Sequence, residues 1–317
     1  MLALNGWTTL TDRRSSSIVL RSVAPLLFAA LLLLVGAFFL LWGDVLNACS
    51  QASFNGKLSL ISQIEEYGRC GGDADESVKE LYSVYESYED WFAAYDCSVA
   101  AGEMPVNDPF EGYPAGEGLS YLESTDYLIG SISIPGIDCD LPLYFGADDD
   151  HLSKGAAVIS GTSIPLGDVN SNCVIAGHRG WMSARYFRDI ENVGLGDALT
   201  LTLPWGVFSY RAVGSAVIDP NDVEALTVFP GKDMVTIITC HPYGYNYQRY
   251  IVYFQRVDDA AASETSVDKG FSFAGSSVAS PLIKVENVLR LLGIVLAATS
   301  AVLLAFGLRK IIRGFAH

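Results

Sequence analysis

A cysteine and an arginine occupy positions where two expected strands would meet. Residues 235–239 are β-branched and apolar, which predicts a buried strand that ends at Cys240. The Pro-Tyr-Gly-Tyr-Asn run at 242–246 predicts a loop, and Arg249 opens a second strand. Antiparallel pairing of these two strands would bring the guanidinium of Arg249 close to the sulfur of Cys240. Because a nearby cation favours the reactive thiolate, this pattern indicates a nucleophile; a buried structural cysteine beside a surface arginine is the alternative.

Among the four histidines, His178 is the best candidate for a general acid or base. It follows a short apolar run and a glycine, which places it at another strand end. His317 is terminal, and His151 follows three aspartates, which predicts an ordinary surface setting. Successive side chains of an extended backbone point to opposite faces, so His241 should point away from the face of Cys240. A structural histidine is the alternative for His178.

Two segments around these residues resemble the sortase family. Thr-Ile-Ile-Thr-Cys at 236–240 is similar to the family's Thr-Leu-x-Thr-Cys signature, with Ile237 in place of Leu. The continuation Pro-Tyr-Gly-x-Asn-x-x-Arg resembles class C, the pilin-polymerising branch. Ala-Gly-His-Arg-Gly at 176–180 is similar to the segment around the family's catalytic histidine. The resemblance covers residues 119–256 well and neither terminus specifically. It implies three catalytic residues: His178, Cys240 and Arg249.

Residues 101–120 carry so many glycines and prolines that no helix or long strand is expected there. An exposed linker is one interpretation. Within this run, Asp108-Pro109-Phe110 resembles the Asp-Pro-aromatic lid of class C sortases. The resemblance implies that Phe110 fills the substrate groove while Asp108 meets the thiol or the arginine.

Short strand-like segments separated by turn residues dominate the region 121–257. They lie at 127–134, 140–144, 156–160, 173–176, 198–203, 208–213, 217–218, 235–239 and 249–255. Several short strands with few helices predict a barrel or a sandwich. The resemblance implies a mainly β fold, a closed β-barrel of the sortase type.

Two uncharged apolar runs, 22–43 and 291–308, flank the rest of the chain. At about 1.5 Å per residue each is close to the roughly 30 Å of a bilayer core, which predicts two transmembrane helices. Basic residues lie outside both runs: Arg13, Arg14 and Arg21 before the first, and Arg309, Lys310 and Arg313 after the second. This predicts that both termini are cytoplasmic. A signal peptide is the alternative for the first run, although its usual apolar region is only about 7 to 15 residues.

The part between the two runs is strongly acidic. From Asn47 to Ile283 there are 33 acidic and 12 basic residues, a formal charge of −21. A domain with this charge lacks the excess of basic residues that binding to nucleic acid requires. Six cysteines would permit disulfides outside the cell, and Cys70 with Cys97 is the first pair to test. The sequence has no Cys-x-x-Cys, no His-x-x-x-His and no phosphate-binding glycine loop, so no metal and no cofactor are expected.

These patterns together predict the organisation of the chain. The expected segments are a cytoplasmic N-terminus (1–21), a transmembrane helix (22–43), an extracellular helical segment (44–100), a lid (101–120), the catalytic barrel (121–257), a tether (258–290), a second transmembrane helix (291–308) and a cytoplasmic tail (309–317). The expected location is the cell membrane of a Gram-positive cell, with the catalytic domain outside.

The resemblance also implies an activity. A class C sortase is a cysteine transpeptidase that cleaves a Leu-Pro-x-Thr-Gly-like sorting signal after Thr through a thioester and joins it to a lysine amine of a pilin subunit. Its partners would be pilins or surface proteins that bear such signals. The alternatives are a housekeeping sortase that attaches proteins to the cell wall, a cysteine protease with water as acceptor, and a non-enzymatic membrane-anchored surface protein. Thioester formation at Cys240 would distinguish the last from any enzyme.

Overall fold

The computed structural model describes residues 8–86, 126–180, 184–257, 271–273 and 280–315. The chain divides into two compact units, one formed by Met1–Val45 with Pro281–His317 and the other by Leu46–Ser280. The expected lid residues Asp108, Pro109 and Phe110 lie outside the described residues, as does Cys97.

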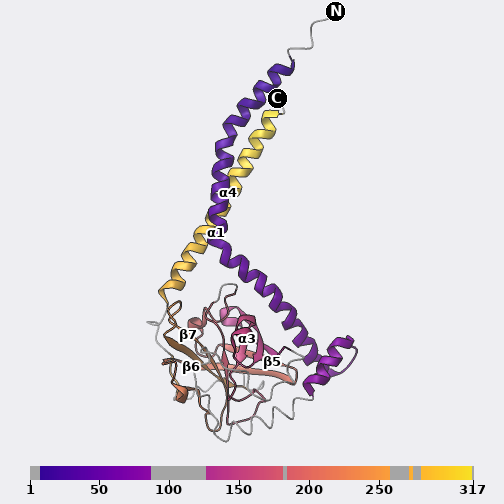
Figure 1. Cartoon of the computed structure of the whole chain (residues 1–317), viewed down its shortest axis with the longest axis vertical. Helices are drawn as coiled ribbons and strands as arrows, with labels where there is room; N and C mark the ends of the chain where they lie inside the picture. Colours follow the sequence, from indigo (N-terminus) through magenta and orange to yellow (C-terminus); the bar gives the residue numbers. More distant parts are fainter. Residues whose placement is uncertain (1–7, 87–125, 181–183, 258–270, 274–279, 316–317) are drawn as a thin grey trace, which may run out of the picture. The chain divides into compact units, whose positions relative to one another are not determined.

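The larger unit contains a closed eight-stranded barrel (Figure 1). Its strands are β1 (Leu128–Ile134), β2 (Cys139–Phe145), β3 (Ala156–Val158), β4 (Ser171–Ala176), β5 (Ala198–Leu203), β6 (Gly206–Ile218), β7 (Asp233–His241) and β8 (Gln248–Arg256). They follow the order β1-β2-β3-β4-β7-β8-β6-β5, and β5 pairs with β1 to close the barrel. The pairs β2–β3 and β4–β7 are parallel and the others are antiparallel. The expected mainly β barrel is confirmed.

The burial pattern explains why these segments form a barrel. Along β5, buried and half-buried residues alternate, as in a strand with one face in a core. The central strand β7 is buried over almost its whole length. The segments expected as separate strands at 208–213 and 217–218 form the single strand β6. Its register shifts between Ala212 and Gly214, where residues 271–273 pass so close that a Cβ on Gly214 would lie 2.8 Å from Phe271 Cβ.

Within the described residues, four short helical segments connect the strands. They are α3 (Asp149–Lys154) and the 3₁₀ turns η2 (Pro135–Ile137), η3 (Ile190–Asn192) and η4 (Val223–Leu226). In α3, Asp148 caps the helix by accepting a 2.8 Å hydrogen bond from the backbone N–H of His151. The expected surface setting of His151 is wrong. Its ring is buried, stacks on Tyr144 at 5.4 Å and lies 2.7 Å from the carbonyl oxygen of Gly146.

The N-terminal helix α1 runs without interruption over Thr8–Cys70. Within the larger unit, its C-terminal part packs Phe54 and Ile61 into the buried clusters of the barrel. After the break at 71–75 the chain is helical again over the described residues 76–86. There the Tyr85 hydroxyl donates a 2.6 Å hydrogen bond to the carbonyl of Leu128, which ties this helix to β1.

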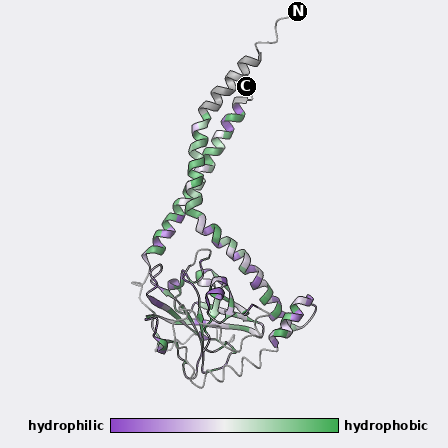
Figure 2. Ribbon diagram, in the orientation of Figure 1, coloured by the Kyte–Doolittle hydropathy of each residue, from purple (hydrophilic) through white to green (hydrophobic). Residues whose placement is uncertain are grey.

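The smaller unit consists of the first part of α1 and of α4 (Pro281–Phe315), which run side by side (Figure 1). Both are long and apolar enough to cross a membrane, judged by length and composition (Figure 2). Small buried residues spaced by seven line the contact: Ala30 and Ala37 on α1, and Gly293, Ser300 and Gly307 on α4. Such residues let two helices approach closely. The Ser300 hydroxyl donates a 2.8 Å hydrogen bond to the carbonyl of Ala30.

Candidate active site

Three adjacent strand ends converge on Cys240. In the barrel, β7 lies between β4 and β8. The antiparallel register places Cys240 directly opposite Arg249, so their side chains project from the same face of the sheet. On the other side, the parallel ladder pairs Ala176 with Ile238, and the register continued by two residues reaches His178 beside Cys240. Neighbouring strands are about 4.8 Å apart, so the three residues named by the sequence lie together.

Two hydrogen bonds extend the contact between β4 and β7 beyond the end of β4. The backbone N–H of Gly177 donates to the Ile238 carbonyl at 3.3 Å. The buried Thr239 hydroxyl donates to the Gly177 carbonyl at 2.7 Å. A Cβ on Gly177 would lie 2.5 Å from the buried ring of Phe187, which explains why a glycine stands here. Gly177, which precedes His178, is therefore hydrogen-bonded to Thr239, which precedes Cys240.

Cys240 differs from the other residues of β7 in its exposure. From Asp233 to His241 it is the one half-exposed side chain, and all the others are buried. A buried cysteine behaves as an inert apolar residue, whereas a nucleophile must be reachable. Cys240 is therefore a partly accessible residue at the end of an otherwise inaccessible strand.

His178 is half-buried beside Cys240, and its surroundings favour the neutral imidazole. Burial lowers its pKa below the usual 6.5, and the negative charge of Asp149 opposes this only in part. The ring of Tyr186 meets it edge-on, with centroids 5.9 Å apart. The imidazole of His178 therefore packs against Tyr186 while staying partly exposed to solvent.

Arg249 brings a permanent positive charge to the same place. Its side chain is buried, and Nη1 donates hydrogen bonds to the carbonyls of Asn246 and Gln248 at 2.9 and 2.8 Å. The planar guanidinium carries several N–H donors that can bind an oxyanion. The two backbone bonds hold the guanidinium against the loop between β7 and β8, opposite Cys240.

The reverse face of the same strand ends carries a second group of polar residues. His241 is buried and points away from the face of Cys240, as alternation along the strand requires, and its Nδ1 lies 2.6 Å from Nη1 of Arg179. Arg179 also forms a hydrogen-bonded ion pair with Glu191. Sequence reasoning did not single out Arg179 or Glu191. Alternation from His178 could have placed Arg179 on this face, but no sequence signal points to Glu191.

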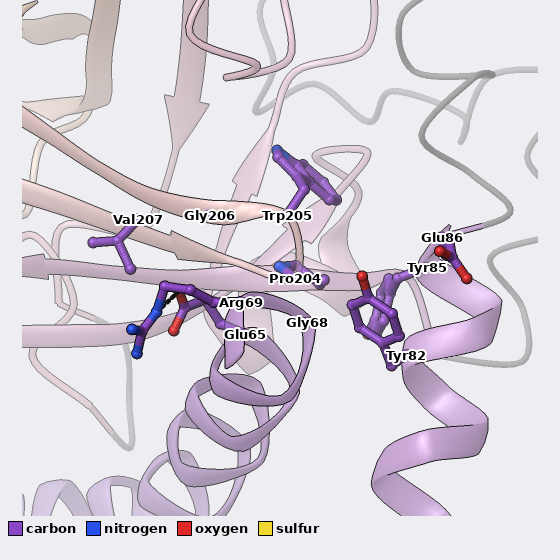
Figure 3. Close-up of a pocket in the computed structure, with 10 residues that line it drawn as sticks. All are labelled: Glu65, Gly68, Arg69, Tyr82, Tyr85, Glu86, Pro204, Trp205, Gly206 and Val207. Carbon is purple, nitrogen blue, oxygen red and sulfur yellow. Dashed lines mark hydrogen bonds and ion pairs between the residues drawn. The ribbon is translucent and has the colours of Figure 1, made fainter. Parts of the chain in front are cut away.

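A cavity of about 600 Å³ lies elsewhere, between the end of α1, residues 76–86 and the β5–β6 hairpin (Figure 3). The rings of Tyr82, Tyr85 and Trp205 are part of its lining. The cavity adjoins the first residues of the 13-residue strand β6, whose last residue, Ile218, pairs with Arg249. It therefore lies at the opposite end of β6 from Cys240 and is not part of the candidate active site.

Comparison with known proteins points to one family. The sortase-domain family profile matches residues 132–257. The chain is 33% identical over 141 residues to sortase D of Bacillus subtilis, an alignment that covers 44% of this chain and 68% of that protein. It is 30% identical over 125 residues to sortase A of Bacillus anthracis, which covers 39% of this chain and 58% of that protein. Among solved structures it is similar to sortase C1 of the GBS pilus island 1, with a TM-score of 0.53, 28% identity, and coverage of 67% of this chain and 95% of that chain.

Proposed function

The chain belongs to the sortase family of cysteine transpeptidases, and we propose that it is a pilin-polymerising sortase of class C with Cys240 as nucleophile, His178 as acid and base, and Arg249 as oxyanion stabiliser. The observation that carries the assignment of roles is the ladder around β7. It pairs the half-exposed Cys240 with the buried Arg249 and aligns it with the backbone that leads to His178.

In the first half-reaction, the thiolate of Cys240 attacks the carbonyl carbon of Thr in a Leu-Pro-x-Thr-Gly-like sorting signal. A carbon–sulfur bond forms and negative charge moves to the carbonyl oxygen, where the guanidinium of Arg249 stabilises it. The carbon–nitrogen bond then breaks, and the imidazolium of His178 gives its proton to the departing amine. A thioester on Cys240 remains.

In the second half-reaction, a lysine amine of a pilin subunit attacks the thioester carbonyl. The neutral imidazole of His178 accepts the proton that the amine loses, an amide bond forms, and the thiolate of Cys240 leaves. Because burial lowers the pKa of His178, the imidazole is mostly neutral at pH 7. The form that carries both a thiolate and an imidazolium is therefore a minor population before substrate binds.

Class C is supported by the likeness to sortase C1 and by the Asp108-Pro109-Phe110 motif in the sequence. We propose that residues 101–120 act as a lid over Cys240. We also propose that α1 and α4 anchor the protein at both ends in the cell membrane, with residues 121–257 as the catalytic part outside the cell. The two long apolar helices and the basic residues that flank them in the sequence support this topology.

A housekeeping sortase that attaches surface proteins to the cell wall is the second candidate, because the sequence relatives include sortases D and A. The acceptor distinguishes the two. Full-length protein in detergent is incubated with a Leu-Pro-x-Thr-Gly peptide and either a lysine-bearing pilin peptide or an amine of the cell-wall precursor. Mass spectrometry should detect the lysine-linked product; preference for the precursor amine would favour the housekeeping function.

Arg249→Lys tests the assigned role of the cation. Lysine keeps the charge but loses the planar fork that can hold the two backbone carbonyls and an oxyanion together. Loss of one oxyanion donor lowers kcat by about 100- to 1000-fold in other enzymes, so we expect a decrease of this order with little change in the far-UV circular dichroism spectrum. A kcat within about threefold of wild type would remove Arg249 from the mechanism.

A further inference from the structure

A buried ion pair lies directly behind the proposed catalytic residues. Arg179 follows His178 in the chain, and its side chain is only 1% exposed. It pairs with Glu191 of η3, whose side chain is 11% exposed. The Arg179 guanidinium also lies over the ring of Tyr250 in β8, with Cζ 5.7 Å from the ring centroid. Arg179 and Glu191 therefore connect three parts of the fold on the face opposite to that of Cys240: the segment that follows β4, the turn η3, and the strand β8.

The contacts of Arg179 converge on the end of β7. Nη1 donates a hydrogen bond to the backbone carbonyl of Cys240 at 3.3 Å and lies 2.6 Å from Nδ1 of His241. Since a guanidinium can only donate, Nδ1 of His241 must be the acceptor, which requires a neutral ring with its proton on Nε2. One side chain thus holds both the proposed nucleophile's own carbonyl and the next residue of the strand.

Glu191 gives the arginine a fixed position. Its Oε1 accepts from Arg179, while its Oε2 accepts a 2.9 Å hydrogen bond from the backbone N–H of Ser280, directly before α4 begins. Both carboxylate oxygens are therefore engaged. Replacing a buried ion pair with well-packed apolar residues is often neutral or stabilising, because removing both charges from water is unfavourable. Such a pair is better explained by the geometry that it maintains.

From this geometry we propose that Arg179, held by Glu191, is a positioning residue that sets the distance between His178 and Cys240. Arg179 directly follows His178 in the chain, and its side chain donates a hydrogen bond to the backbone carbonyl of Cys240. It therefore connects the two strand ends from the face opposite to that of Cys240, without touching substrate. Small displacements of reacting groups change rates strongly, since a misplacement of about 1 Å can lower a rate about 100-fold. The inference rests on the proposed roles of His178 and Cys240.

The test compares wild type, Arg179→Met, Arg179→Lys and Glu191→Gln, with Arg256→Met as matched control. Arg256 also lies over an aromatic ring, with Cζ 4.6 Å from the centroid of Phe208, and approaches a carboxylate, with Nη1 4.0 Å from Asp233 Oδ2. It pairs with Tyr210 in the ladder, at the end of β8 opposite to Arg249. Arg256 is half-buried, with 27% of its side chain exposed, and it therefore controls for the loss of an arginine that packs on an aromatic ring and faces a carboxylate.

For the full-length protein, kcat and KM for a sorting-signal peptide are measured together with the melting temperature. We expect Arg179→Met to lower kcat at least tenfold with KM changed less than threefold, and Arg179→Lys to recover part of kcat. The kcat of Glu191→Gln should lie between those of Arg179→Met and wild type. The kcat of Arg256→Met, per folded molecule, should stay within twofold of wild type. If Arg179→Met does not fold, the Lys and Gln variants carry the same comparison.

Two results would overturn the inference: wild-type kcat in folded Arg179→Lys and Glu191→Gln variants, or an equal loss of kcat in Arg256→Met. Cys240→Ala separates this outcome from failure of the proposed function. If Cys240→Ala keeps turnover, the assigned nucleophile is wrong; if it loses turnover while the Arg179 and Glu191 variants keep it, only the positioning role is wrong.

Discussion

The hydrogen bond between Thr239 and Gly177 offers a quantitative test of how the two strand ends are held. In Thr239→Val the side-chain volume is kept, but a methyl group replaces the hydroxyl that donates to the Gly177 carbonyl at 2.7 Å. Carbon approaches a carbonyl oxygen no closer than about 3.3 Å, so the two strand ends must separate by roughly 0.6 Å at this point.

The expected magnitude follows from burial. Thr239 is fully buried, and a buried acceptor that loses its donor costs about 1 to 3 kcal/mol of unfolding free energy. For a unit the size of Leu46–Ser280, each kcal/mol corresponds to about 2 to 4 °C in Tm. We therefore expect Tm to fall by roughly 2 to 12 °C. Because Gly177 precedes His178, we expect kcat to fall as well, by less than the roughly 100-fold of a full 1 Å displacement.

Thermal unfolding and peptide turnover of the full-length protein measure both effects, with Thr239→Ser as control. Serine keeps the donor and loses one methyl group, about 0.8 kcal/mol of apolar burial, so it should lower Tm slightly and leave kcat near wild type. The reasoning is refuted if Thr239→Val matches wild type in both quantities, or if Thr239→Ser loses as much turnover as Thr239→Val.

Two further predictions concern the proton donor and the apolar helices. Because burial lowers the pKa of His178, the acid limb of kcat/KM plotted against pH should have its midpoint below pH 6.5. Below that midpoint His178 is already protonated, so a further decrease in pH only lowers the thiolate fraction of Cys240. A midpoint above pH 6.5 would contradict this. A Cβ on Gly293 would lie 3.0 Å from α1, so Gly293→Leu should separate the two helices and reduce oxidative cross-linking of cysteines introduced at Ala30 and Ser300. Gly36→Leu, where a Cβ meets nothing within 4 Å, is the control, and equal cross-linking in both variants would argue against the contact.

The sequence predicted the barrel because its strands keep local signatures. Alternation, β-branched residues and turn residues mark each strand, and the segments around Cys240, His178 and Arg249 fall at strand ends in the structure as expected. The extent of the strands was less predictable. The local sequence pattern suggests a break in the strand near Gly214. Strand β6 nevertheless continues through this point with a bulge, because its pairing with β8 resumes on the other side.

Contacts that arise only on closure of the barrel had no local signature. Glu191 reaches Arg179 and His241 from a turn that is remote from β7 in the chain, so spacing could not reveal the group. His151 was misjudged for a different reason. Three aspartates before it suggest a surface, but the capped turn of α3 directs its ring onto Tyr144.

The identity of the acylated residue tests the central claim most directly. Full-length protein is mixed with a Leu-Pro-x-Thr-Gly peptide, quenched in acid and analysed by mass spectrometry before and after proteolysis. Our account predicts one thioester adduct, mapped to Cys240 and absent from Cys240→Ala, which should unfold at a temperature close to that of wild type. An adduct on the exposed Cys49 or Cys70, or undiminished peptide cleavage by Cys240→Ala, would contradict it.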